Sequence, residues 1–225
     1  SFNAMLRGLR WFELYVPKTI VERLIKRGDM SESLSDTRDI TALFTDMVGF
    51  STASQGMTAP EVATFVNHHF TLVAKCIEAQ GGTVDKFIGD AVMAFWDEPQ
   101  DRHQQVARAA RAALEIAKAI RADNKTREKS GEAPVGIRIG IHAGGATVGN
   151  IGAPGRINYT IIGDTVNIAQ RLEQLGKAVF PKGTEVTILV SDEVARALGP
   201  EFNPVSQGQR ILKGRVGKMP VFSLE

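Results

Sequence analysis

FTDMVGFS at residues 44–51 is the stretch that decides the fold of this chain, together with DKFIGDAVM at 85–93. In each stretch an aspartate, Asp46 or Asp90, lies at the edge of an apolar run and close to a glycine. Residues 40–47 read as a strand with both faces buried, because apolar side chains do not simply alternate with polar ones. Residues 83–88 and 91–96 read as two short strands that Gly89 and Asp90 join into a hairpin.

Between and after these strands, the sequence predicts three helices. The capping-box sequence TAPE at 58–61 begins a helix with apolar residues at helical spacing, and Gly81-Gly82 ends it. A second amphipathic helix is predicted at 104–123 and is followed by a charged surface loop at 124–133. A third helix is predicted at 165–175.

The remaining segments complete a recognisable order of elements. Asp164 is expected to cap the third helix, and Ser191 is expected to cap a fourth. The glycine-rich stretch 149–155 reads as a turn. Further β-like segments are residues 135–142, 146–148, 157–162 and a final hairpin across 212–222 about Gly214 and Gly217. The order strand, helix, strand, strand, helix, strand predicts an α+β, ferredoxin-like fold, with an antiparallel sheet and helices on one face.

The first 38 residues differ from the rest in pattern. Residues 1–4, before Met5, read as a tag remnant, and residues 5–27 read as an amphipathic helix broken at Pro17. Residues 28–38 are polar and read as a linker. We therefore expect an N-terminal segment at 1–38 and a folded domain at 39–225. The N-terminal helix can pack on its own domain or on a second copy, lie on a membrane surface, or couple an upstream sensor or membrane domain.

Bulk composition excludes several classes of protein. The chain has 225 residues, of which 43% are hydrophobic and 23% charged, enough for one sizeable core. A net charge of +2 is too small to indicate a nucleic-acid partner. No stretch approaches the roughly 18–20 apolar residues that span a bilayer. The single Cys76 excludes an internal disulfide and fits a cytoplasmic location.

The two aspartates predict a site for metal and phosphate. The first and third strands of a ferredoxin-like sheet are neighbours, so Asp46 and Asp90 can converge. Carboxylate oxygens are ligands that Mg²⁺ prefers, and it completes its shell with substrate phosphates and water. The backbone N–H groups after Asp46 suit a triphosphate, and the residues that carry them are Met47, Val48, Gly49, Phe50 and Ser51.

Three motifs in this order, FTDMVGFS, KFIGDAVM and IGDTVNIAQRLE, resemble the catalytic domain of class III nucleotidyl cyclases. The resemblance runs from about Ile40 to Phe222 and makes 39–225 a nucleotidyl cyclase catalytic domain. It implies a homodimer with active sites at the interface and two Mg²⁺ or Mn²⁺ ions in each. One protomer would supply the metal-binding aspartates, and the other would supply the residues that contact the purine and the transition state.

The same resemblance gives individual residues their expected roles. Asp46 and Asp90 would bind metal, with the Met47 carbonyl as an added ligand. Lys86 would read the purine ring. Asn167 and Arg171 would orient the ribose and stabilise charge on the α-phosphate; four residues apart, they share one helix face. Lys213 would bind the terminal phosphates, with Arg215 as a nearby substitute.

Two positions depart from the family pattern. Thr160 stands where many adenylyl cyclases have an aspartate that accepts a hydrogen bond from adenine, and a threonine hydroxyl can accept or donate. Guanylyl members tend to carry Glu and Cys at the Lys86 and Thr160 positions, which favours ATP here. The Lys/Thr pair is similar to the subgroup that contains bicarbonate-responsive soluble adenylyl cyclases. The turn at 142–145 lacks an arginine that some members use on phosphate.

The expected activity is that of an adenylyl cyclase, which converts ATP to cyclic AMP and pyrophosphate. A guanylyl cyclase is one alternative. A second is a cyclase-like domain that only binds nucleotide or a partner protein, although the polar site residues are intact. RNA binding on the sheet is disfavoured, because the aromatic residues lie in helices or beside the aspartates.

Overall fold

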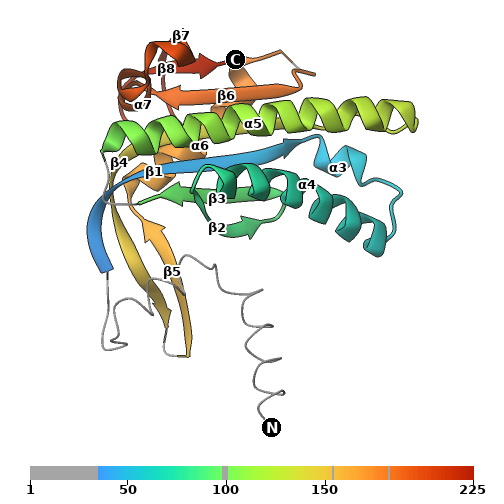
Figure 1. Cartoon of the computed structure of the whole chain (residues 1–225), viewed down its shortest axis with the longest axis horizontal. Coiled ribbons are helices and arrows are strands. Elements are labelled where there is room, and N and C mark those ends of the chain that lie inside the picture. The colour runs from blue at the N-terminus through green and yellow to red at the C-terminus, as the bar shows by residue number, and fades with distance from the viewer. Residues whose placement is uncertain (1–34, 98–100, 154, 182) are drawn as a thin grey trace.

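The computed structural model describes residues 35–97, 101–153, 155–181 and 183–225 (Figure 1). The predicted tag remnant, the helix at 5–27 and the linker up to residue 34 lie outside the described residues. The elements in chain order are β1 Ser35–Val48, α3 Phe50–Ala53, α4 Ala59–Ala79, β2 Thr83–Ile88, β3 Ala91–Trp96, α5 Arg102–Lys129, β4 Gly136–Ala153, β5 Arg156–Ile162, α6 Asp164–Val179, β6 Val186–Ser191, α7 Asp192–Ala197, the 3₁₀ turn η1 Pro200–Phe202, β7 Val205–Arg210 and β8 Met219–Leu224.

One sheet organises the molecule. Its strand order is β2-β3-β1-β4-β6-β8-β7, and β5 pairs with β4. The first four strands in this order are antiparallel and form the predicted ferredoxin-like unit, with β1 between β3 and β4. The β4–β6 pair is parallel. The fold class is therefore confirmed, and it places the ends of β1 and the β2–β3 turn close together.

Helices cover both faces of this sheet, not one face as predicted. Along β1, Leu43 packs in a core with α4 and α5, while its neighbour Phe44 packs on the opposite side with Ala169 of α6 and Ile161 of β5. Because successive side chains of a strand point to opposite faces, a strand apolar at consecutive positions needs cover on both sides. In Figure 1, α4 and α5 lie across one face and α6 across the other.

The contact between β4 and α6 is unusually close. A side chain at Gly140 would collide with the backbone of Ala169 and Glu173, so the helix lies directly on the strand's backbone. Gly140 thus allows the close approach that a larger residue would prevent. This contact fixes α6, which carries Asn167 and Arg171, against the centre of the sheet.

Several predicted boundaries were wrong. Residues 35–38 of the expected linker belong to β1 and pair with β4, and Arg38 forms an ion pair with Asp97. The expected loop at 124–133 is helical to Lys129. Buried Asn124 explains this, since its amide donates to the Val135 carbonyl at 2.8 Å and accepts from the Val135 N–H at 2.8 Å. The two β-like segments after it are one strand, β4, which runs through most of the expected turn at 149–155.

The C-terminal part also differs from the prediction. Strand β6 was not predicted, and the last hairpin consists of β7 and β8 with residues 211–218 as its connection. Gly214 and Gly217 lie in this connection with positive φ angles. Asp164 does not cap α6; Gly163 holds that position, and Asp164 pairs with Arg215 at 3.1 Å. Ser191 does cap α7, as predicted, by accepting from the Val194 N–H.

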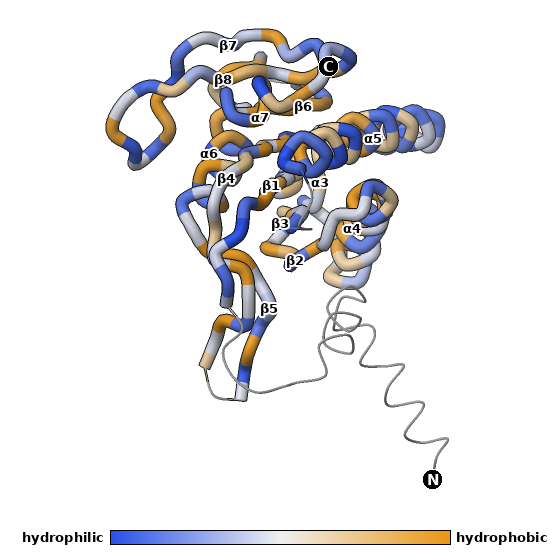
Figure 2. Tube along the Cα trace, turned by 60° about the vertical axis from the view of Figure 1, so that its left-hand side comes forward, coloured by the Kyte–Doolittle hydropathy of each residue, from blue (hydrophilic) through white to orange (hydrophobic). Residues whose placement is uncertain are grey.

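An arm made of β5 and the end of β4 extends beyond the sheet (Figures 1 and 2). Hydrophobic and hydrophilic residues are mixed along it (Figure 2). Ile157 and Ile162 leave 62% and 53% of their surface exposed, which is high for isoleucine.

Among the helices that the structure describes, none is long and apolar enough to cross a membrane.

Candidate active site

Asp46 and Asp90 meet at one cavity of about 520 Å³. Asp46 reaches it from the end of β1, and Asp90 reaches it from the turn between β2 and β3. Gly49, at φ 81°, turns the chain from β1 into α3 and leaves the segment after Asp46 along the cavity wall. The other predicted phosphate-binding residues, Met47, Val48, Phe50 and Ser51, line the same cavity.

The two carboxylates interact electrostatically. Burial raises the pKa of Asp46, and the negative charge of Asp90 raises this pKa further, whereas Arg138 lowers it. Two carboxylates that repel each other across a cavity are a favourable place for a divalent cation. In the described part of the chain, no cluster of three or more His, Cys, Asp or Glu side chains could hold a metal. The donor set fits Mg²⁺, which needs only one or two carboxylates when phosphates and water complete its shell.

Arg138 links the cavity to the interior. Its Nη2 forms an ion pair with Asp46 Oδ2, and its Nε donates to Glu173 Oε1 of α6 at 2.9 Å. Burial raises the pKa of Glu173 to about 7; the charges of Asp46 and Asp90 also raise it, and Arg138 opposes the rise. The sequence prediction missed both residues. Arg138 lies outside the motifs, and Glu173, the last residue of the third motif, is linked to Asp46 only in space, through Arg138.

A second group of predicted residues lies elsewhere on the chain. Lys86 Nζ donates to Thr160 Oγ1 at 3.0 Å, so the two residues expected to read the purine are in contact. The Thr160 hydroxyl in turn donates to Asp85 Oδ2 at 2.6 Å. Asp85 was not predicted, although its position next to Lys86 was a signal that could have identified it.

The residues expected to act on ribose and phosphate lie on and beside α6. Asn167 is exposed on the first turn of the helix, and Arg171 follows one turn later, half-buried. The 211–218 connection approaches them: a Cβ placed on Gly214 would lie 3.5 Å from Arg171 Nη2. Lys213 is therefore on the segment next to Arg171 and is exposed.

Within one chain, the residues predicted to contact the purine, the ribose and the terminal phosphates do not line the cavity of the two aspartates. None of Lys86, Thr160, Asn167, Arg171 and Lys213 lines the cavity of Asp46 and Asp90. Helix α6 contributes to this cavity only from its C-terminal end, through Gly176 and Lys177. The structure thus places these five predicted residues outside the cavity that Asp46 and Asp90 line.

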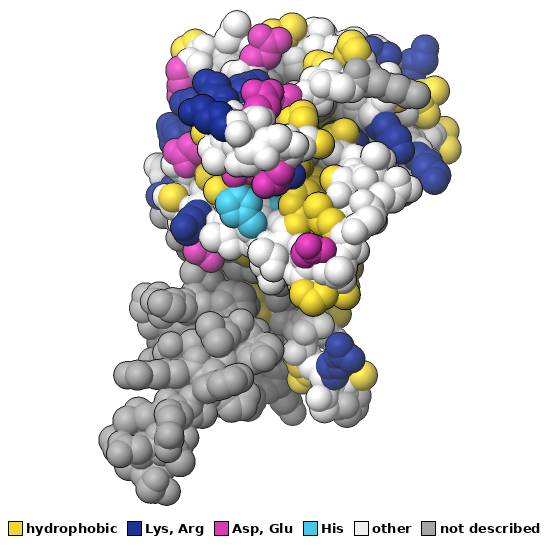
Figure 3. Space-filling view, turned by 90° about the vertical axis from the view of Figure 1, so that its right-hand side faces the viewer, with side chains coloured by type: hydrophobic (Ala, Val, Ile, Leu, Met, Phe, Trp, Pro, Cys, Tyr) yellow, Lys and Arg dark blue, Asp and Glu magenta, His cyan; other side chains and the backbone are white. Residues whose placement is uncertain are grey.

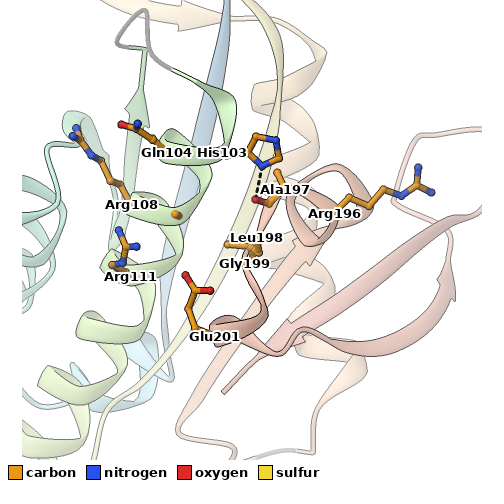
Figure 4. Close-up of a pocket in the computed structure, with 10 residues that line it drawn as sticks. His103, Gln104, Arg108, Arg111, Arg196, Ala197, Leu198, Gly199 and Glu201 are labelled. Atoms are coloured by element: carbon orange, nitrogen blue, oxygen red, sulfur yellow. Dashed lines mark hydrogen bonds between the residues drawn. The ribbon is translucent and has the colours of Figure 1, made fainter.

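The face of the molecule in Figure 3 and the cleft between α5 and α7 show no convergent group of like charges. Figure 3 shows one side of the molecule, where acidic, basic and apolar side chains are interspersed without a field of one sign. A cleft of about 530 Å³ between α5 and α7 is lined by Arg108, Arg111, Arg196 and Glu201 (Figure 4). Arg108 and Arg196 point away from each other there, so the cleft holds no convergent group of charges.

Comparison with known proteins gives consistent results. A family model described as the adenylate and guanylate cyclase catalytic domain matches residues 33–225. "Adenylate cyclase 1" of Rhizobium meliloti (strain 1021) is 38% identical over 177 residues, which are 79% of this chain and 27% of that protein. The adenylyl cyclase CyaB from P. aeruginosa superposes with a TM-score of 0.76 at 29% identity, covering 86% of this chain and 96% of that one. The guanylyl cyclase Cya2 superposes with a TM-score of 0.71 at 29% identity, covering 84% and 93%.

Proposed function

The chain belongs to the adenylate and guanylate cyclase catalytic domain family, and from this premise we propose that it is an adenylate cyclase that converts ATP to 3′,5′-cyclic AMP and pyrophosphate. The observation that carries the choice of ATP is the contact between Lys86 Nζ and Thr160 Oγ1. A lysine ammonium can donate to an adenine ring nitrogen, and a hydroxyl oxygen can accept from the adenine amino group. Curated relatives named adenylate cyclase support the same choice.

The cavity of Asp46 and Asp90 is the proposed metal and triphosphate site. Two Mg²⁺ or Mn²⁺ ions bound by Asp46, Asp90 and the Met47 carbonyl would lower the pKa of the ribose 3′ hydroxyl and neutralise the phosphates. The residues after Met47 line the cavity and can present backbone N–H groups to the phosphate oxygens. The protein's contribution at this end is therefore to hold the triphosphate in line for attack by the 3′ oxygen.

The other residues would act on the same nucleotide from a second copy of the chain. Asn167 would orient the ribose, Arg171 would stabilise charge on the α-phosphate, and Lys213 would bind the terminal phosphates. None of them lines the aspartate cavity of its own chain, which supports this arrangement. A C₂ homodimer of identical chains would contain two equivalent sites. The exposed isoleucines of the β4–β5 arm suit such an interface.

Product identification tests the proposal. The chain is incubated with ATP or GTP in the presence of Mg²⁺ or Mn²⁺, and the products are separated by chromatography. We expect cyclic AMP and pyrophosphate from ATP, and little cyclic GMP from GTP. Cyclic GMP as the main product would make the chain a guanylate cyclase, and nucleotide binding without turnover would make it a regulatory domain.

We also propose that bicarbonate regulates the enzyme and that its catalytic domain is cytoplasmic. The Lys86–Thr160 pair is the reason to propose that bicarbonate raises ATP turnover, and an assay with bicarbonate against chloride at fixed pH tests this. ATP as the substrate favours a cytoplasmic catalytic domain. The chain spans 27% of the length of its Rhizobium relative, which supports an upstream sensor or membrane domain in the full-length protein.

A further inference from the structure

Asp85 is a buried carboxylate in contact with both residues proposed to read the purine. Its side chain is 1% exposed, and its Oδ2 accepts the hydroxyl proton of Thr160 at 2.6 Å. The same oxygen lies 3.3 Å from Lys86 Nζ. Because Lys86 also donates to Thr160 at 3.0 Å, the three side chains form a closed hydrogen-bonded group.

An irregularity in β2 makes this group possible. Adjacent residues of a regular strand point to opposite faces, so Asp85 and Lys86 could not both reach one hydroxyl. The pairing of β2 with β3 shifts register between Val84 and Lys86, which leaves Asp85 as the extra residue of a β-bulge. Bulges re-aim side chains in this way and are frequent beside functional sites.

We propose that Asp85 is the positioning residue that sets the preference for adenine over guanine, by fixing the direction of the Thr160 hydroxyl. This inference rests on the proposed function and adds to it the cause of the base preference. A threonine hydroxyl has one proton, and Asp85 accepts it. The hydroxyl is then left as an acceptor only.

The acceptor-only hydroxyl distinguishes the two bases at the atom where they differ. Adenine carries an amino group at C6, which donates, whereas guanine carries a carbonyl, which accepts. The amino group gains a hydrogen bond to Thr160, and the carbonyl would face a second acceptor. Unpaired polar groups in a buried site give strong discrimination.

The role needs Asp85 in its ionised form, which its contacts with Thr160 and Lys86 favour and its burial disfavours. Burial raises the pKa of the Asp85 carboxyl, and this rise is opposed by the hydrogen bond from Thr160 and by the charge of Lys86. A carboxylate has only acceptor atoms, so while it is ionised Thr160 must be the donor.

The primary test is Asp85→Asn. The asparagine amide can donate to Thr160, which releases the hydroxyl proton and removes the fixed direction. We expect the ratio of kcat/KM for ATP to kcat/KM for GTP to fall roughly tenfold or more, mainly through a higher KM for ATP and with little change in kcat. The matched control is Asp97→Asn, since Asp97 is also 1% exposed and accepts from Arg38 at 3.1 Å. An unchanged ratio in Asp85→Asn would overturn the inference.

A double-mutant cycle tests whether Asp85 acts through Thr160. Thr160→Val keeps the side-chain shape without the hydroxyl, so it should lower the ratio by itself. The combination with Asp85→Asn should be no worse than the stronger single variant. Additive losses would contradict the inference. A wild-type ratio in Thr160→Val would also contradict it, and this can be measured even if Asp85→Asn does not fold.

Binding measurements separate this inference from the proposed function. Competition of ATP and GTP for a fluorescent nucleotide gives the base preference without turnover. If the wild-type chain makes no cyclic nucleotide, the proposed function fails. The inference then stands only if ATP binds better than GTP and Asp85→Asn removes the difference.

Discussion

Arg138 forms an ion pair through Nη2 with Asp46, which lines the cavity, and another through Nε with the buried Glu173. Its contacts with Asp46 and Glu173 connect the proposed metal site to α6. Glu173 is the more buried of the two acids, with a pKa raised from 4.5 to about 7. Since the folded state holds this proton more tightly than the unfolded state, Glu173 makes folding stability depend on pH.

We predict that Glu173→Gln flattens the pH dependence of stability. Between pH 4.5 and about 7 the unfolded chain releases the Glu173 proton first, so the wild-type free energy of unfolding falls as pH rises. The loss attributable to this group is at most about 3 kcal/mol, the size of its pKa shift. Urea unfolding at several pH values checks this. Identical profiles for the two proteins would show that the Glu173 pKa is not raised.

A second residue-scale prediction concerns the metal site. Asp46→Asn removes the charge at the end of β1 while keeping the side-chain shape. We expect turnover with Mg²⁺ or Mn²⁺ to fall at least about a hundredfold, because charge stabilisation by metal is the largest catalytic contribution proposed here. Circular dichroism and the dimer content should be unchanged. Asp39→Asn, on the same strand and in an ion pair with Arg102, is the matched control and should retain activity. Undiminished cyclic AMP production by Asp46→Asn would exclude Asp46 as a metal ligand.

Sequence reasoning reached the motif residues but not their partners. Asp46, Asp90, Lys86 and Thr160 stand in patterned segments, so their elements could be predicted and their neighbourhood inferred. Arg138 lies 92 residues from Asp46 in sequence, and Asp85 lies 75 residues from Thr160. No local pattern reports such a contact, because it depends on strand register and, for Asp85, on a bulge.

At the scale of elements, long periodic helices were predictable, whereas polar segments and the short buried strand β6 were not. The capping box at Thr58 and the apolar stripe after it gave α4. The last turns of α5 are rich in charge and read as a loop, yet Asn124 ties them to Val135 by two hydrogen bonds. Strand β7 was missed because it is mostly exposed, and exposed strands lack the apolar alternation that identifies a strand.

The β4–α6 contact gives a prediction at this scale. Gly140→Ala should destabilise the fold by roughly 2 kcal/mol or more, since the added methyl group meets helix backbone that cannot rotate away. Gly145→Ala is the matched control on the same strand: a Cβ placed there would have nothing within 4 Å, so its effect should stay within about 0.5 kcal/mol. Denaturant unfolding measures both. Equal stabilities would mean that α6 can move off the strand at little cost.

At the scale of the whole molecule, the predicted site residues do not share one cavity, since Lys86, Thr160, Asn167, Arg171 and Lys213 lie outside that of Asp46 and Asp90. Sequence reasoning anticipated a shared site only through the family resemblance. The order of elements predicted that Asp46 and Asp90 converge, but composition and periodicity do not indicate which other side chains face the same cavity. The arrangement of β1, the β2–β3 turn and α6 supplies that information.

Mixing two inactive variants tests the shared site. Asp46→Ala lacks one half of the site and Arg171→Ala lacks the other, so each alone should be inactive. After dissociation and random reassociation, half of the dimers are mixed and contain one intact site of two. Activity should therefore recover to roughly a quarter of wild type. No recovery, together with full activity of wild type diluted to the monomer, would show that each chain works alone.

Gly140 has a mechanical consequence. At Gly140 no side chain separates the strand from the helix, so their backbones are in direct contact and leave no space for a displacement at that point. This contact ties α6 to the sheet, with the cavity-lining residues Gly176 and Lys177 at one end of the helix and Asn167 near the other. In the proposed homodimer, a regulatory signal is therefore expected to change the site by tilting one chain against its partner, and not by sliding α6 along the sheet.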